Sequence, residues 1–154
     1  MILEASDQLA GAWPHYYDSL TLFSPARFSA FPDAPFAGDC DRYPRRDEVV
    51  DYLTRYAERL GVEIRTNTRV EAVEKADGAF VVRTADGRTL TSVGIVAATG
   101  ASGNPVRPAF PGQEGFTGEL LHVADYREPK AYAGKRVVVV AAATQPSRSA
   151  TNSR

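Results

Sequence analysis

The sequence predicts an α/β fold that contains a small antiparallel β-meander. Apolar residues recur at three- and four-residue spacing over residues 46–60, which is typical of an amphipathic helix, and Gly61 follows as a C-terminal cap. Three strand-like runs come next, at 63–73, 80–84 and 88–98, and the two turns between them contain Asp-Gly, a pair that favours hairpins. These two observations predict one helix followed by the meander.

The remaining segments are less regular. The chain begins with an apolar, strand-like run over residues 1–5. Residues 11–43 are rich in aromatic side chains and prolines, so we expect an ordered, packed loop region there. Residues 135–140 form a continuous run of mainly β-branched side chains, which is typical of a strand buried on both faces of a parallel sheet.

Composition excludes several classes of function. The chain has 154 residues, a formal net charge of -1 and no long basic block, so we expect no nucleic-acid partner. Cys40 is the single cysteine, which rules out an internal disulfide and a Cys-rich metal site, and no metal ligands are predicted. No apolar run approaches the ~20 residues of a membrane span and no signal peptide is visible, so we expect no membrane partner and a cytoplasmic location.

Glu4 closes the first apolar run and is the first candidate for a binding residue. In a dinucleotide-binding unit, an acidic residue at a strand end accepts hydrogen bonds from the adenosine ribose hydroxyls. A glutamate at a strand end is also common as a solvated edge residue. The small residues Ala98, Thr99 and Gly100, which follow the last run of the meander, suit a close approach of backbone to a ligand.

Several segments read together resemble a known family. They are residues 2–5, 11–13, 43–49 and 98–100, and the pattern Phe116-x-Gly118-x-x-x-His122-x-x-x-Tyr126. The sequence is similar to the flavin-containing monooxygenase superfamily, especially its bacterial cation-transport-associated flavoprotein branch. Tyr126 points to the heteroatom-oxygenating or a related branch, since a tryptophan there would resemble the Baeyer-Villiger enzymes.

The resemblance implies a partial FAD/NAD(P)-binding Rossmann-like fold of the two-dinucleotide-binding flavoprotein type. It implies FAD and NADPH as cofactors, a small-molecule substrate, and oxygen insertion through a flavin C4a-hydroperoxide. The roles that it implies are Glu4 as FAD ribose ligand, Gly11 and Trp13 beside the pyrophosphate or isoalloxazine, Val70 as a backbone contact to adenine, residues 98–100 beside the flavin nucleotide, and His122 as a link between domains. No catalytic acid or base is evident.

The family's two glycine-rich loops are not found in the sequence. We therefore expect residues 1–134 to be a partial FAD-binding domain without its first glycine loop, 135–140 to be the first strand of an NADPH-binding domain, and 141–154 to be a disordered tail. Codons for the last fourteen residues, read one base earlier, can encode GGGNSAVQIGNELA. This suggests a frameshift near Val140 and an internal or misassigned start at Met1, which the coding DNA would test.

Two other interpretations stay open. One is a flavin-dependent NAD(P)H reductase or a disulfide-reductase relative of the same layout, although no Cys-x-x-Cys pair is present. The other is a cofactor-free interaction module built from the helix at 46–60 and the meander at 63–98. Under the leading interpretation the chain is an inactive fragment of an oxidoreductase.

Overall fold

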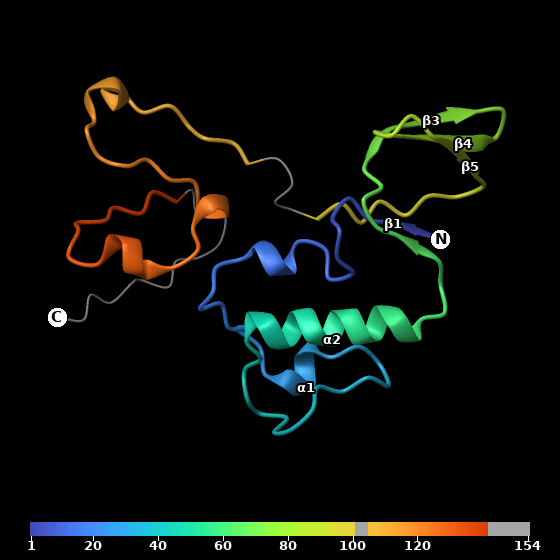
Figure 1. The fold of residues 1–154 in the computed structure, drawn as a ribbon, viewed down its shortest axis with the longest axis horizontal. Coiled ribbons are helices and arrows are strands. Elements are labelled where there is room, and N and C mark those ends of the chain that lie inside the picture. The colour runs from blue at the N-terminus through green and yellow to red at the C-terminus, as the bar shows by residue number, and fades with distance from the viewer. Residues whose placement is uncertain (101–104, 142–154) are drawn as a thin grey trace.

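The computed structural model describes residues 1–100 and 105–141, arranged around the long helix α2 (Arg46–Arg59) (Figure 1). Strand β1 (Ile2–Leu3) pairs in parallel with β2 (Ile64–Arg65), with Ile2 opposite Ile64. Parallel strands need a long crossover, and here the connection passes through α2. A strand is thus present within the predicted run at 1–5, although it covers only Ile2–Leu3, and the α/β character of this part of the chain is confirmed.

The meander follows, with strand order β3 (Val70–Ala76), β4 (Ala79–Thr84) and β5 (Thr89–Ser92), all antiparallel. Asp77 and Gly78 form the first turn with φ of 50° and 80°, the backbone of a tight two-residue hairpin. The predicted run at 63–73 is split between β2 and β3, because Asn67 turns the chain with a φ of 51°.

The expected strand at 88–98 is too long. Strand β5 ends at Ser92, whose hydroxyl donates to the carbonyl of Gly94 at 2.6 Å and accepts from the Gly94 N–H at 3.3 Å. This local turn leads the chain out of the sheet. Val93 and Val96, which we expected in the strand, are 96% and 91% exposed.

Helix α2 matches its prediction closely. The N–H of Arg45 donates to the carboxylate of Glu48 at 2.9 Å, which caps the first turn, and Gly61 ends the helix with a φ of 60°. Val49 and Tyr52 are its buried side chains. Residues 11–43 form the expected loop region, with two short helical turns, η1 (Trp13–His15) and α1 (Ala26–Ser29), but it is less packed than expected, since Phe23 and Phe28 are 97% and 72% exposed.

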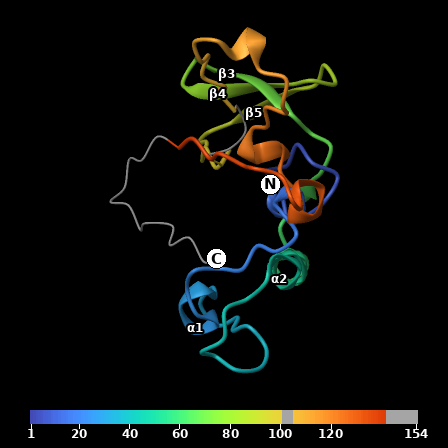
Figure 2. The same cartoon turned by 90° about the vertical axis from the view of Figure 1, so that its left-hand side faces the viewer.

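The strands and α1 lie on opposite sides of α2 (Figure 2). The buried residues are few and mostly small, and they come from the loops, α2 and the meander: Ala10, Ala26, Ala34, Pro44, Val49, Tyr52, Thr68, Val82 and Thr84. No helix within residues 1–100 and 105–141 has the length and apolar character needed to cross a membrane.

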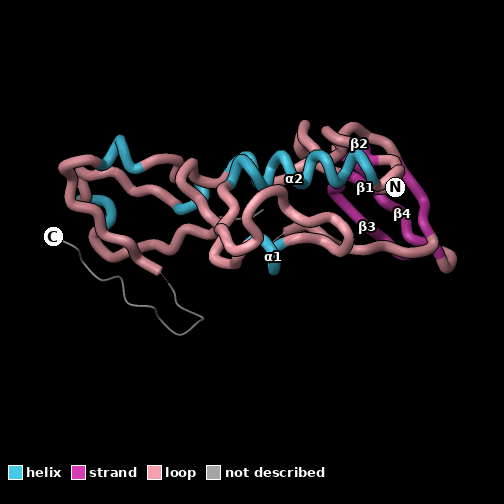
Figure 3. Tube along the Cα trace, turned by 90° about the horizontal axis from the view of Figure 1, so that it is seen from below, coloured by secondary structure: helices cyan, strands magenta, loops and turns pink. Residues whose placement is uncertain are grey.

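Residues 105–141, called the arm below, extend away from the strands, beyond the end of α2 that carries Arg46 (Figures 1 and 3). The arm contains three short helical turns, η2 (Gln113–Gly115), η3 (Val123–Asp125) and η4 (Pro129–Tyr132). Residues 135–140, expected as a buried strand, are in no strand here, and Val138 and Val139 are 86% and 84% exposed. A strand needs a partner backbone, and none of the described strands pairs with this run. The predicted tail lies outside the described residues, apart from Ala141.

Candidate functional site

The carboxyl end of β1 carries Glu4, the first of the predicted binding residues. Its N–H donates to the carbonyl of Arg65 at 2.9 Å, which continues the parallel pairing past the strand. One carboxylate oxygen, Oε1, accepts from the N–H of Ser6 at 2.8 Å, and the residue is half-buried. The side chain is therefore held in one orientation at the edge where parallel sheets bind ligands.

Gly11 lies directly against this carboxylate. Its φ is 58°, and a Cβ added there would stand 3.5 Å from Oε2 of Glu4. That oxygen accepts no hydrogen bond from the described residues, so it is free to accept from a ligand hydroxyl. The structure thus brings together Glu4 and Gly11, for which the resemblance implies a place at the FAD ribose and beside the pyrophosphate or isoalloxazine.

Val70 lies two residues after Thr68, whose backbone is hydrogen-bonded to Glu4. The N–H of Thr68 donates to the carbonyl of Glu4 at 2.8 Å, and Val70 begins β3 two residues later with 40% of its surface exposed. Thr68 itself is only 3% exposed. The sequence did not predict Ser6 or Thr68 as site residues. Their backbone N–H groups donate to Glu4, and no sequence pattern indicates such hydrogen bonds.

Trp13 lies in η1, which packs on α2. It is half-buried, and its ring makes an edge contact with Tyr16 at a centroid distance of 5.4 Å. Ala98, Thr99 and Gly100 follow the meander in an exposed, irregular segment in which Gly100 has a φ of 74°. In the described part of the chain, no hydrogen bond joins these three residues to Glu4 or Gly11.

The four motif residues all lie in the arm. The ring of Phe116 covers Gly118, where a Cβ would be 2.5 Å from the ring Cζ. His122 precedes η3, and its Nδ1 accepts from the N–H of Ala124 at 3.1 Å. Tyr126 packs near Tyr17, with ring centroids 5.9 Å apart. The motif therefore shapes the arm, and only Tyr126 of the four reaches across to the N-terminal loops.

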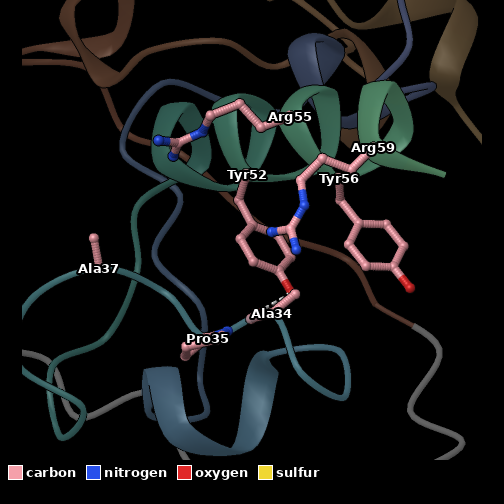
Figure 4. A pocket seen from close by; sticks show the side chains of 7 residues that line it. All are labelled: Ala34, Pro35, Ala37, Tyr52, Arg55, Tyr56 and Arg59. Atoms are coloured by element: carbon pink, nitrogen blue, oxygen red, sulfur yellow. Dashed lines mark hydrogen bonds between the residues drawn. The ribbon is translucent and has the colours of Figure 1, made fainter. Parts of the chain in front are cut away.

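Two shallow hollows lie along α2, away from Glu4. The one in Figure 4 has a volume of about 190 Å³, below the ~300 Å³ typical of small-molecule pockets. The other is an open surface along the same helix. None of the predicted site residues lines either hollow. The side chains of the first are Ala34, Pro35, Ala37, Tyr52, Arg55, Tyr56 and Arg59.

The residues at the end of β1 fit one part of FAD. A carboxylate with a free oxygen can accept hydrogen bonds from the two hydroxyls of the adenosine ribose. A glycine beside it leaves the backbone open to the neighbouring phosphates. Glu4 and Gly11 have this arrangement. The exposed backbone at 98–100 is accessible to a nucleotide, although no hydrogen bond ties it to the Glu4 end.

The chain matches known proteins over most of its length. The model of the family described as "Pyridine nucleotide-disulphide oxidoreductase" matches residues 1–144. Indole-3-pyruvate monooxygenase YUCCA1 of Oryza sativa subsp. japonica is 40% identical over 142 residues, which cover 90% of this chain and 35% of that protein. An uncharacterized CzcO-like oxidoreductase of Geobacillus kaustophilus is 33% identical over 92% of this chain and 40% of its own length.

A solved structure is similar as well. A flavin-containing monooxygenase from Stenotrophomonas maltophilia superimposes with a TM-score of 0.80 at 36% identity, covering 87% of this chain and 41% of that one. The chain thus spans 35% to 41% of the length of these three relatives. The resemblance to flavin-containing monooxygenases is confirmed over this partial length.

Proposed function

The chain belongs to the pyridine nucleotide-disulphide oxidoreductase family, and from that premise we propose that it is part of an FAD- and NADPH-dependent oxidoreductase of the monooxygenase type. The similarity to an indole-3-pyruvate monooxygenase and to a flavin-containing monooxygenase supports the monooxygenase branch. The similarity to a CzcO-like oxidoreductase supports the bacterial branch that the sequence resembles. The substrate class is a small molecule, and a cytoplasmic location suits this chemistry.

The observation that carries the proposal is the placement of Glu4. Oε2 of Glu4 stands 3.5 Å from the Cβ position of Gly11, at the carboxyl end of a parallel strand. In this proposal Glu4 holds the adenosine ribose, Gly11 admits the pyrophosphate, and the backbone near Val70 borders the adenine. Bound FAD would supply the redox chemistry, and these residues would orient its adenosine half.

The other roles follow the same proposal. Trp13 stands toward the pyrophosphate or isoalloxazine, and Ala98, Thr99 and Gly100 run along the flavin nucleotide. Among the described residues these groups do not form one closed cavity with Glu4, so we propose that the 154-residue chain binds FAD weakly and turns over little or no substrate. The family's disulfide chemistry is not proposed, because Cys40 is the single cysteine and a redox pair needs two.

Titration of the purified chain with FAD, followed by flavin fluorescence, tests the proposal. We expect saturable but weak binding. Replacement of a charged acceptor removes about 1.5 kcal/mol or more, so Glu4→Gln should weaken the affinity at least roughly tenfold. Glu71→Gln is the matched control, because Glu71 is an exposed glutamate on β3 and its side chain makes no hydrogen bond to a described residue.

The two halves of the proposal fail in different ways. Equal affinities for wild type and Glu4→Gln would exclude Glu4 as the ribose ligand. Tight, stoichiometric FAD binding would contradict the view that the chain holds only part of the site. Addition of NADPH to the FAD-loaded chain should leave the flavin absorbance unchanged, and rapid bleaching would show that the chain is active by itself.

A further inference from the structure

Among the described residues, the hydrogen bonds and ring contacts of the arm with the rest of the protein all fall on one short segment of the N-terminal loops. The N–H of Asp18 donates to the carbonyl of Arg127 at 2.8 Å. The rings of Tyr17 and Tyr126 lie 5.9 Å apart with a tilt of 49°. The Arg127 guanidinium is 3.5 Å from the carbonyl of Tyr16, a long hydrogen bond. Three successive residues of one loop thus contact two successive residues of the arm.

Helix α2 holds the same loop segment from its other side. Nη1 of Arg46, the first residue of α2, donates to the carbonyl of Tyr16 at 2.8 Å and to the carboxylate of Asp18, while its Nε donates to Asp47 at 2.8 Å. The pKa of the Arg46 guanidinium is raised above its ordinary value, mainly by the hydrogen bond to Asp47 and next by the hydrogen bond to Asp18. Tyr16 and Asp18 therefore contact α2 and the arm at once.

Burial sets Arg46 apart from the other ion-pairing arginines. Its side chain is 16% exposed, whereas the arginines of the other ion pairs in the described part of the chain are 30% to 62% exposed. Its acidic partners Asp18 and Asp47 are 57% and 78% exposed, so these ion pairs contribute little by themselves, and the part-buried hydrogen bond to the carbonyl of Tyr16 ties Arg46 to the loop. Arg46 is thus placed to hold the loop in one conformation, unlike an arginine that lies exposed on the surface.

The motif supplies the arm's side of this contact. Tyr126 also packs near Tyr132 at a centroid distance of 6.1 Å, and the Tyr132 hydroxyl is 3.4 Å from the carboxylate of Glu119. Tyr126 is therefore tied into the arm as well as into the loop. His122, which the resemblance makes the link between domains, bonds only to its own turn among the described residues.

We infer that Tyr126 and Arg127 dock the arm on residues 16–18, and that Arg46 is the positioning residue that holds this loop segment in the docking shape. We call this set the latch. The latch sets where the arm, and with it the run at 135–140, stands relative to α2. This inference goes beyond the proposed function, since it depends on the contacts and not on FAD binding.

Amide hydrogen exchange of the whole chain, followed by NMR, tests the latch. The Asp18 amide is bonded across the latch, whereas the Leu20 amide bonds locally to Tyr17 and the Asp125 amide bonds within the arm to His122. We expect Tyr126→Ala to speed exchange at Asp18 by about tenfold or more, with Leu20 and Asp125 changed much less. Tyr126→Phe keeps the ring, so it should preserve the protection of Asp18.

The positioning role of Arg46 is tested from α2. Arg46→Ala should also expose the Asp18 amide, and Arg46→Lys, which retains the charge and a donor, should restore part of the protection. Arg83→Ala is the matched control, because it removes an exposed ion pair with Glu74 on the meander. We expect no change at Asp18 in this variant.

Two results would overturn the inference. In the first, Asp18 stays protected in both Tyr126→Ala and Arg46→Ala. In the second, all amides accelerate together, which would make these contacts part of the global fold rather than a docking contact. Asp18→Asn alters an exposed side chain with little risk to folding. If the amide at position 18 exchanges no faster in this variant, the ion pair between Arg46 and Asp18 does not contribute to the latch.

Discussion

The hydroxyl of Tyr52 donates a hydrogen bond to the carbonyl of Ala34 at 2.7 Å, so that α2 holds the loop beneath it. The same hydroxyl accepts from the N–H of Phe31 at 2.8 Å. The Tyr52 ring stacks on Phe36 at a centroid distance of 4.0 Å (Figure 4 shows Tyr52 beside Ala34). One buried side chain thus satisfies two backbone groups of a loop segment whose only described ladder contact is the isolated bridge between Phe31 and Ala34.

Tyr52→Phe should destabilise the protein by about 1–3 kcal/mol, because it leaves a buried carbonyl and a part-buried N–H without their partner while the ring stack is kept. Tyr56→Phe is the matched control. Tyr56 lies on the same helix and stacks on Phe31, and its hydroxyl bonds to no described residue. Urea unfolding of both variants gives the comparison, and equal midpoints would refute the structural role of the Tyr52 hydroxyl.

Gly11→Ala and Gly61→Ala separate backbone strain from ligand binding. The two glycines have φ of 58° and 60°, so each alanine should cost about 1–2 kcal/mol in the free energy of unfolding. Only the Cβ at position 11 approaches Glu4, whereas nothing lies within 4 Å at position 61. We therefore expect similar losses of stability but weaker FAD binding in Gly11→Ala alone, as measured by fluorescence titration. Matching FAD affinities in the two variants would argue against the site at Glu4.

The turn between β4 and β5 should give a pH-dependent stability. The pKa of Asp86 is held well below its ordinary value, mainly by a hydrogen bond from the Arg88 guanidinium and next by one from the Thr84 hydroxyl. A carboxyl with a lowered folded-state pKa stabilises the fold above its unfolded pKa of about 3.9, and this contribution is lost as the pH falls through the folded pKa.

The stability difference between wild type and Asp86→Asn should accordingly be full above about pH 4 and shrink as the pH falls further. Unfolding curves from pH 6 down to the acid limit of the folded protein measure it. Asp51→Asn serves as the control, because Asp51 is exposed on α2 and its side chain has no ion pair in the described residues. A difference that grows toward acid would reverse the sign and contradict the turn geometry.

Local chemistry in the sequence was enough to predict the regular elements. The periodic apolar residues and Gly61 placed α2 almost to the residue, because both depend on neighbours within a few positions. The pair Asp77-Gly78 predicted its hairpin for the same reason. The strand predicted at 88–98 was too long, and the run at 135–140 is in no strand. Both differences arise because an apolar run becomes a strand only where a partner backbone lies beside it.

The sequence by itself therefore determined the helix, the meander and the family resemblance, and through that resemblance it placed Glu4 and Gly11 among the candidate binding residues. Only the tertiary structure decided that Oε2 of Glu4 lies beside Gly11, and that Tyr126 rather than His122 reaches the N-terminal loop. The physical reason is distance along the chain. Propensity and periodicity act over a few residues, whereas contacts between separate segments depend on how the whole chain packs.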